Sequence, residues 1–230
     1  MQNSKLKKIV LFKLKLIKTT DIKMKKVIAI VAVLFSMNMI AQSQYEKGMG
    51  KAFELWEAKK NTEASQLFER ISKVEKENWL PPFYVATIEI LGSFGLKDEA
   101  KLEAKLKKAQ EFLDEAKSLS EKNPEIMITQ ALLNTAYIAF DGQKYGMTLS
   151  MKNTNLYAEA EKLAPNNPRV ILGKAEWNMG SAQFFGTSIE PYCKDVEKSL
   201  TLFKTDNPEK FHPRWGEKRA KQVMKKCKVK

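Results

Sequence analysis

The sequence predicts an all-α protein, an α-solenoid of about four helix–turn–helix units followed by a C-terminal capping helix. Apolar residues recur at helical spacing through the body of the chain, and no apolar–polar alternation is sustained over five or more residues, as a half-buried strand would require. A short sequence pattern also recurs at intervals of 44 and 45 residues. A single helix pair cannot bury its apolar stripe alone, so repeated pairs are expected to stack on one another.

The recurring pattern is a junction between two helices and is clearest at residues 160–177. One helix closes with Ala160 and Leu163, which lie on one face because they are three residues apart. Asn167 tolerates the left-handed conformation that ends a helix, and Pro168 is pre-organised for the first turn of the next one. Related junctions are found at residues 116–131, more loosely at 71–86, and in degraded form at 199–210.

The closing helices also carry a triplet of side chains at spacings of four and three. The triplets are Ala64, Phe68 and Ile71, and Ala109, Leu113 and Ala116. Residues at these spacings share one face of a helix, so each triplet predicts a helix-packing surface. An alanine seven or eight residues into the opening helix, such as Ala131 or Ala175, lets neighbouring helices approach closely.

On these triplets and the turn at 165–168, most of residues 45–205 resembles the tetratricopeptide repeat family. The resemblance implies a groove that holds a peptide or a partner protein. Three departures qualify it. The junctions are 45 and 44 residues apart rather than 34, a period that HEAT-like helix pairs share. Extra residues lie around 92–108 and 140–152, and the aromatic and glycine positions of the first helix of the repeat are poorly kept.

The helices are placed in order by periodicity and by the turn residues between them. Polar residues such as Asp98, the prolines at helix starts, and the glycines are the main boundary signals. Loops are expected around Gly92 and Gly95, Gly142 and Gly146, and Gly180, Ser181 and Gly186. The predicted helices span about 45–59, 62–77, 82–93, 97–120, 124–140, 145–164, 168–184, 191–204 and 215–227.

Residues 24–43 have the layout of a secretory signal peptide. Two lysines precede the apolar run 27–35, and small residues near Ala41 offer a cleavage site. We therefore expect an exported protein, periplasmic or secreted, whose mature chain does not span a membrane. Residues 1–23 are either a start-site extension, which we favour because signal peptides begin at their own methionine, or an amphipathic membrane-binding helix. The repeats would then occupy 44–205, and the capping helix and basic tail 206–230.

The net charge of +13 is concentrated at the two ends of the chain. Residues 1–23 carry seven lysines against one aspartate, Lys25 and Lys26 follow, and residues 217–230 carry seven basic residues against one glutamate. The body, 44–216, is close to neutral. The basicity therefore says little about the function of the fold, and no nucleic-acid partner is predicted.

Cys193 and Cys227 are the two cysteines, and an exported protein favours a disulfide between them. Two free buried thiols are the alternative, and a nucleophilic cysteine would have only His212 as a histidine base. The three residues lack the spacing of a zinc site. We expect a structural His212, because Pro213 breaks the chain before the last helix and its aromatic neighbours pack that helix down.

Four aromatic residues lie in segments expected to be loops. They are Tyr145, Phe184, Phe185 and Tyr192. They would form a ligand-facing, partner-binding edge at the inserted loops, or they would cover the ends of helix pairs, which we favour because large aromatics are usually buried.

Together these features predict a non-enzymatic interaction scaffold of the bacterial cell envelope that binds a protein or peptide in its groove. No phosphate loop, catalytic triad motif or metal motif is present, so no catalytic, cofactor-binding or metal-binding residue is predicted. The alternatives are binding of an anionic lipid or glycan surface through the basic C-terminal helix, and an enzyme subunit using loop residues. The sequence names neither the partner nor the oligomeric state.

Overall fold

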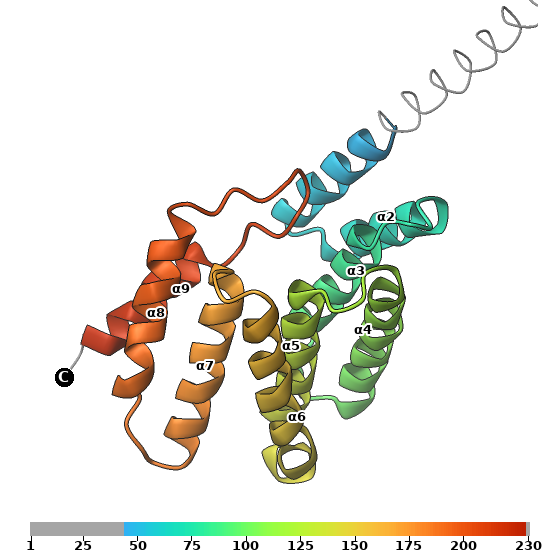
Figure 1. Ribbon diagram of the computed structural model, residues 1–230. Helices are drawn as coiled ribbons and strands as arrows, with labels where there is room; N and C mark the ends of the chain where they lie inside the picture. Colours follow the sequence, from blue (N-terminus) through green and yellow to red (C-terminus); the bar gives the residue numbers. More distant parts are fainter. Residues whose placement is uncertain (1–43, 229–230) are drawn as a thin grey trace, which may run out of the picture. The chain divides into compact units, whose positions relative to one another are not determined.

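A computed structural model describes residues 44–228, in which the regular structure is entirely helical (Figure 1). The description below concerns the compact unit Met49–Lys230. After a helix over residues 44–57, the helices are α2 (Asn61–Val74), α3 (Leu80–Leu91), α4 (Glu99–Leu119), α5 (Pro124–Phe140), α6 (Gly142–Leu163), α7 (Pro168–Phe184), α8 (Glu190–Phe203) and α9 (Glu217–Lys228). The all-α prediction is confirmed, and every predicted helix is present with its ends within three residues. The signal-peptide and start-site predictions fall on residues 1–43, outside the described range.

Successive helices pack against one another in chain order. Each helix from α2 to α8 contacts the next one, and α5 also contacts α3 and α7. In Figure 1, α4, α5, α7 and α8 follow one another from right to left. These neighbours are consistent with helical repeats, in which each unit rests mainly on the units beside it.

Alanines in register allow the opening helices to approach their neighbours closely. Ala86, Ala131, Ala175 and Ala220 lie in α3, α5, α7 and α9, and each is completely buried. They are 44 or 45 residues apart. Ala220 belongs to the series although the sequence pattern had not singled it out, so the register extends into the last helix.

The closing helices α2, α4 and α6 bury the same triplet, and α8 buries the last two members of its own. The two predicted triplets are confirmed as packing faces, since all six side chains are at most 9% exposed. Equivalent triplets are Asn153, Tyr157 and Ala160 in α6, and Tyr192, Val196 and Ser199 in α8. The apolar residue three places later is not buried at two of the junctions: Val74 and Leu163 are 77% and 44% exposed. Each is the last residue of its helix.

The extra residues lengthen two helices instead of forming loops. Residues around 92–108 and 140–152 contribute to α4 and α6, which have 21 and 22 residues. Asp98 caps α4 by accepting from the Lys101 amide, and Asp141 caps α6 by accepting from the amides of residues 143 and 144. The loop prediction is therefore wrong at Gly142 and Gly146. It is also wrong at Gly180 and Ser181, which lie inside α7.

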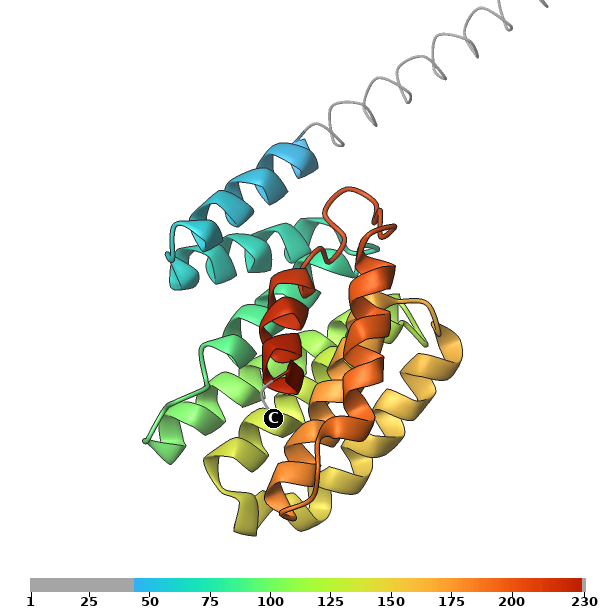
Figure 2. The same ribbon diagram turned by 90° about the vertical axis from the view of Figure 1, so that its left-hand side faces the viewer.

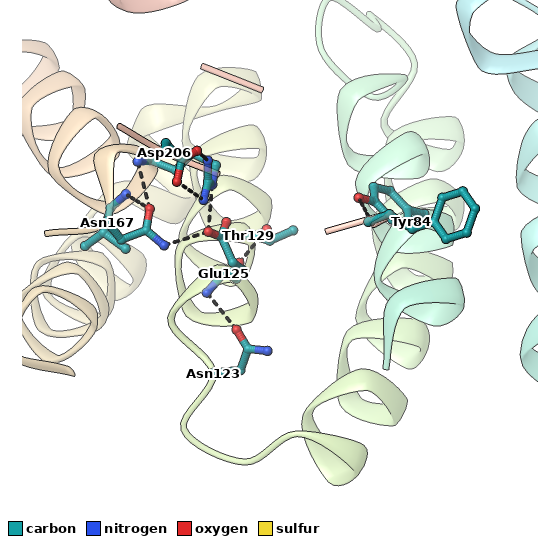
Figure 3. Close-up of polar contacts among 9 residues, drawn as sticks. Tyr84, Asn123, Glu125, Thr129, Asn167 and Asp206 are labelled. Carbon is teal, nitrogen blue, oxygen red and sulfur yellow. Dashed lines mark hydrogen bonds and ion pairs between the residues drawn. The ribbon is translucent and has the colours of Figure 1, made fainter. Parts of the chain in front are cut away.

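A buried ion network joins the starts of α5 and α7 to the segment after α8. Arg169, only 4% exposed, donates through Nε to Glu125 Oε1 at 2.7 Å and through Nη1 to Asp206 Oδ2 at 2.5 Å. Asn167 Nδ2 donates to the same Glu125 oxygen at 2.7 Å. Figure 3 shows Glu125, Asn167 and Asp206 converging on one point. Burial alone would lower the pKa of Arg169, but the hydrogen bonds and charges of Asp206 and Glu125 outweigh it and raise that pKa.

A second cluster of polar contacts connects α2, α3 and α4 through Glu89, which is 8% exposed. Ser65 Oγ donates to Glu89 Oε1 at 2.8 Å, and Lys105 Nζ donates to Oε2 at 2.8 Å. Burial would raise the pKa of Glu89, but the hydrogen bonds from Lys105 and Ser65 and the charges of Lys105 and Lys108 lower it. The carboxylate therefore stays ionised inside an otherwise apolar helix.

A disulfide ties the last two helices together. Cys193 in the first turn of α8 is joined to Cys227 in the last turn of α9, with their Cα atoms 5.8 Å apart. Tyr84 Oη in α3 also donates to the Phe211 carbonyl at 2.6 Å, a contact drawn in Figure 3. The segment between α8 and α9 is thus held at Asp206 and at Phe211.

We predict that Arg169→Met lowers the free energy of unfolding by about 3–5 kcal/mol, because it leaves two buried carboxylates without their cation. Arg70→Met, at an exposed position in α2, is the control and should change stability by less than about 0.5 kcal/mol. Urea denaturation followed by circular dichroism measures both. Equal stability of the two variants would contradict a structural role for the network.

We predict that Cys193→Ser/Cys227→Ser lowers the free energy of unfolding by about 3–4 kcal/mol, because the bond closes a loop with a sequence separation of 34 residues. Reduction of the wild-type protein should lower its melting temperature, whereas the same reductant should leave the double variant unchanged. Alkylation of two thiols in the native, unreduced protein would show that the bond is absent.

Candidate functional site

A pocket of about 1200 Å³ opens between α4, α5 and α6 and the turn that joins α4 to α5. Its volume is slightly above the range of roughly 300–1,000 Å³ that is usual for small-molecule sites. Much of its surface is aliphatic. The apolar side chains in the lining are Leu113, Ile126, Met127, Leu133, Leu149 and Leu156.

Two tyrosines form the aromatic end of the pocket. Tyr137 comes from the last turns of α5 and Tyr145 from the first turn of α6, with ring centroids 4.9 Å apart and planes inclined by 46°. Burial is the main reason why the pKa of Tyr137 is raised, and the neighbouring Tyr145 and Glu103 add to it. Tyr137 is therefore a neutral phenol at physiological pH.

Glu99 fixes the position of Tyr145. Its Oε1 accepts from Lys144 Nζ at 2.6 Å and from Tyr145 Oη at 3.1 Å. The hydrogen bond from Lys144, followed by that from Tyr145, lowers the pKa of Glu99, and the same contacts raise the pKa of Lys144. The cluster is exposed, so it orients the ring more than it stabilises the fold.

A row of side-chain amides crosses from α4 through α5 to α6. Gln110 and Gln130 exchange hydrogen bonds of 2.9 and 2.8 Å, and both line the pocket. Asn134 Nδ2, also in the lining, donates to Asn153 Oδ1 at 2.9 Å. Asn153 is completely buried and donates to the Ala131 carbonyl at 3.0 Å. The buried asparagine amides of this row are therefore hydrogen-bonded within the protein, while the amides of Gln110 and Gln130 lie at the pocket surface.

Charged side chains of both signs lie in the pocket lining, four lysines and three carboxylates. Lys117, Lys122, Lys144 and Lys152 are in the lining, together with the acidic Asp114, Glu121 and Glu159. Lys144 is paired with Glu99. Within the described range no ion pair engages Lys117, Lys122 or Lys152, so these ammonium groups are available to an anionic ligand.

Of the four aromatic residues singled out in the sequence, the structure places only Tyr145 in the pocket, on α6 instead of a loop. Phe184 and Phe185 meet edge to face at the end of α7 and are 81% and 74% exposed, so the expected burial is wrong for them. Tyr192 lies in α8 and packs partly buried against the cluster that contains Val196. Partner binding by these residues stays a prediction.

Sequence reasoning missed the polar face of α5. Gln130, Asn134 and Tyr137 follow one another at spacings of four and three, so they lie on one side of a mostly apolar helix. A polar stripe on an otherwise buried helix is the signal that could have identified the pocket. The residues of α4 and α6 that face this polar stripe could not be identified from the sequence, because that requires knowing how the three helices are aligned side by side.

The residues considered for catalysis do not form a reactive site. Cys193 and Cys227 are joined in the disulfide, so neither offers a thiolate to the enzymatic hypothesis. The ring centroids of His212 and Trp79 are 5.5 Å apart, and His212 Nδ1 lies 3.9 Å from Glu209 Oε2. Between residues 44 and 228, no group of three His, Cys, Asp or Glu side chains is placed to hold a metal ion. In the same range, no helix is long and apolar enough to cross a membrane.

No protein-family model and no curated protein matches the chain. Among solved structures, it is similar to the HusA haemophore from Porphyromonas gingivalis, with a TM-score of 0.71 and 24% sequence identity. The match covers 80% of this chain and 93% of that chain. A likeness at this identity shows a shared helical fold. The relation to tetratricopeptide repeats remains a resemblance.

Proposed function

We propose that the protein is an exported, non-enzymatic binding protein whose pocket between α4, α5 and α6 takes a flat, anionic aromatic ligand of the porphyrin class. The pairing of Tyr137 with Tyr145 beside an aliphatic surface and the lysines of the lining carries the proposal. Export rests on the signal-peptide layout of residues 24–43, and the disulfide is consistent with it.

The chemistry of a porphyrin matches the three parts of the pocket. Its conjugated faces stack on aromatic rings and leave water readily for aliphatic surroundings. Its carboxylates need cations, which Lys117, Lys122 and Lys152 supply. The similar solved structure is a haemophore, a haem-carrying protein, and this supports the ligand class. The porphyrin would be cargo, so the proposal agrees with the absence of a predicted cofactor.

The pocket lining favours recognition of the ring over recognition of iron. Haem iron is held in proteins by His, Cys, Met or Tyr side chains. The residues that line this pocket include no histidine or cysteine. Burial keeps the Tyr137 phenol protonated and Tyr145 Oη donates to Glu99, so neither tyrosine is placed as an iron-binding phenolate, and Met127 is the one remaining ligand type in the lining. We therefore expect metal-free protoporphyrin to bind with an affinity within about tenfold of that of haem.

The regular register supports a tetratricopeptide-like solenoid as the scaffold. The four buried alanines repeat at intervals of 44 or 45 residues, and so do the first three triplets, as stacked helix pairs require; the fourth triplet follows after 39 residues. In that arrangement, α4, α5 and α6 span two neighbouring units, and the pocket lies where those units meet.

We predict saturable binding of haem and of protoporphyrin IX, seen as a shift of the porphyrin absorbance band on titration. Tyr137→Leu and Tyr145→Leu should each weaken binding about three- to tenfold through lost stacking. Lys117→Gln/Lys152→Gln should weaken it about tenfold through lost carboxylate contacts. Phe184→Ala/Phe185→Ala is the control, because it removes two aromatic rings outside the pocket and should leave affinity unchanged. Absence of saturable binding would contradict the proposal, and so would an equal loss in the control.

A peptide or protein segment is the second candidate for the same pocket. The observation that favours it is the Gln110–Gln130 pair, whose amides could exchange their mutual hydrogen bonds for a peptide backbone. The tetratricopeptide resemblance implies this ligand class.

We predict that a cross-linked pull-down from the envelope fraction retains one or two proteins at high salt. Gln130→Leu should lose them, whereas Gln66→Leu, at an exposed position in α2, should keep them. Equal capture by wild type and Gln130→Leu would exclude the pocket as the binding site.

A further inference from the structure

The last helix presents a one-sided row of positive charge. Lys218, Lys221, Lys225 and Lys228 follow one another at spacings of three, four and three, so they lie on one face of α9, and all four are exposed. At 1.5 Å per residue the row is about 15 Å long. Figure 2 shows α9 in front of the other helices, beside α8.

The opposite face of α9 is already occupied. Ala220 and Val223 are buried in a cluster with residues of α7 and α8, and the disulfide at Cys227 fixes the last turn to α8. α9 therefore cannot turn its apolar face toward a membrane without leaving the fold. The lysine face is the part of α9 that an outside partner can reach.

The charge of this face is largely uncompensated. Glu217 pairs with Lys221 at 2.5 Å, and Glu176 pairs with Arg219 at 2.6 Å. Among the described residues, no ion pair engages Lys218, Lys225, Lys226 or Lys228. Since residues 44–216 are close to neutral, the positive potential of the described chain is concentrated on α9.

An indole lies at the start of the row. Trp215 is 41% exposed, although a large aromatic side chain is usually buried. Together with Lys218, Arg219 and Gln222 it lines a shallow pocket of about 560 Å³. Tryptophan is enriched where proteins meet the headgroup region of a bilayer, because its ring is apolar and its N–H is polar.

We propose that Trp215 and the lysine row of α9 form a peripheral docking surface for an anionic lipid bilayer. A straight row of ammonium groups matches a planar array of lipid phosphates, and each lysine near such a surface strengthens binding about fivefold. The exposed indole beside the row matches the headgroup region of a bilayer, where the ring can enter the apolar boundary while the lysines meet the phosphates. The pocket between α4, α5 and α6 takes no part, so this inference is independent of the porphyrin proposal.

The test is co-sedimentation of the full chain with vesicles of phosphatidylcholine alone or with 30% phosphatidylglycerol added. The variant Lys218→Gln/Lys225→Gln removes two unpaired charges of the row. The control Lys76→Gln/Lys107→Gln removes the same charge from exposed positions outside α9. All variants keep residues 1–43, so any contribution from that lysine-rich segment is the same in each. Thermal unfolding confirms that the variants are folded.

We expect the difference between wild type and the row variant to appear only with the anionic vesicles, and to shrink with rising salt as screening predicts. The row variant should lower the partition coefficient at least about tenfold, and the control variant less than about twofold. Tryptophan emission should shift to shorter wavelength on binding, and Trp215→Phe should abolish the shift. Equal losses in the two double variants would overturn the proposal. Retention on a heparin column without vesicle binding would also overturn it, by pointing to a glycan.

Discussion

The buried guanidinium of Arg169 is the interaction on which the arrangement of the helices depends. Its two carboxylate partners belong to other junctions of the chain, Glu125 at the start of α5 and Asp206 before the Asn207-Pro208 turn. Glu125 and Arg169 each follow an Asn-Pro pair, so they occupy equivalent positions in adjacent repeats with opposite charges. A charge pair between equivalent positions sets the distance and register of the two units. Removing one partner leaves an unpaired buried charge, which is why such a pair specifies one arrangement even where its net stabilisation is small.

Helix α5 transmits this constraint to the pocket. Its first turn is held by Arg169 through Glu125, and its middle is held by Asn153 through the Ala131 carbonyl. Its last turns contact α6 through Tyr137 and Tyr145. Asn153 replaces the alanine found at the first triplet position of α2 and α4, so a small packing residue has become a hydrogen-bonding one. The polar face of α5 is therefore presented from a helix that is fixed along its length, as a preorganised binding site requires.

The sequence predicted the helices well because their signals are local. Pro124 and Pro168 mark two starts, and the boundaries of α5 and α7 were predicted without error. It failed at Gly142 and Gly146, because the cap from Asp141 outweighs the low helix propensity of glycine there. For Tyr192 the sequence analysis left a ligand-facing edge open beside the favoured covering role, although the triplet register that Tyr192 shares with Asn153 indicates packing. The pocket could not be predicted, since it combines side chains of three helices whose contacts depend on long-range register.

One of the two departures from a 34-residue repeat contributes directly to the lining of the pocket. Residues around 140–152 supply Lys144, Tyr145 and Lys152 to its lining. The other insertion, around 92–108, supplies Glu99, which holds the Tyr145 ring in place. Each insertion lengthens a helix, so the added side chains are carried on rigid backbone and not on a loop. A sequence that otherwise agrees with its repeat pattern is expected to break it where binding requires other residues. In the proposed function, the insertion around 140–152 that weakens the family resemblance supplies part of the binding pocket.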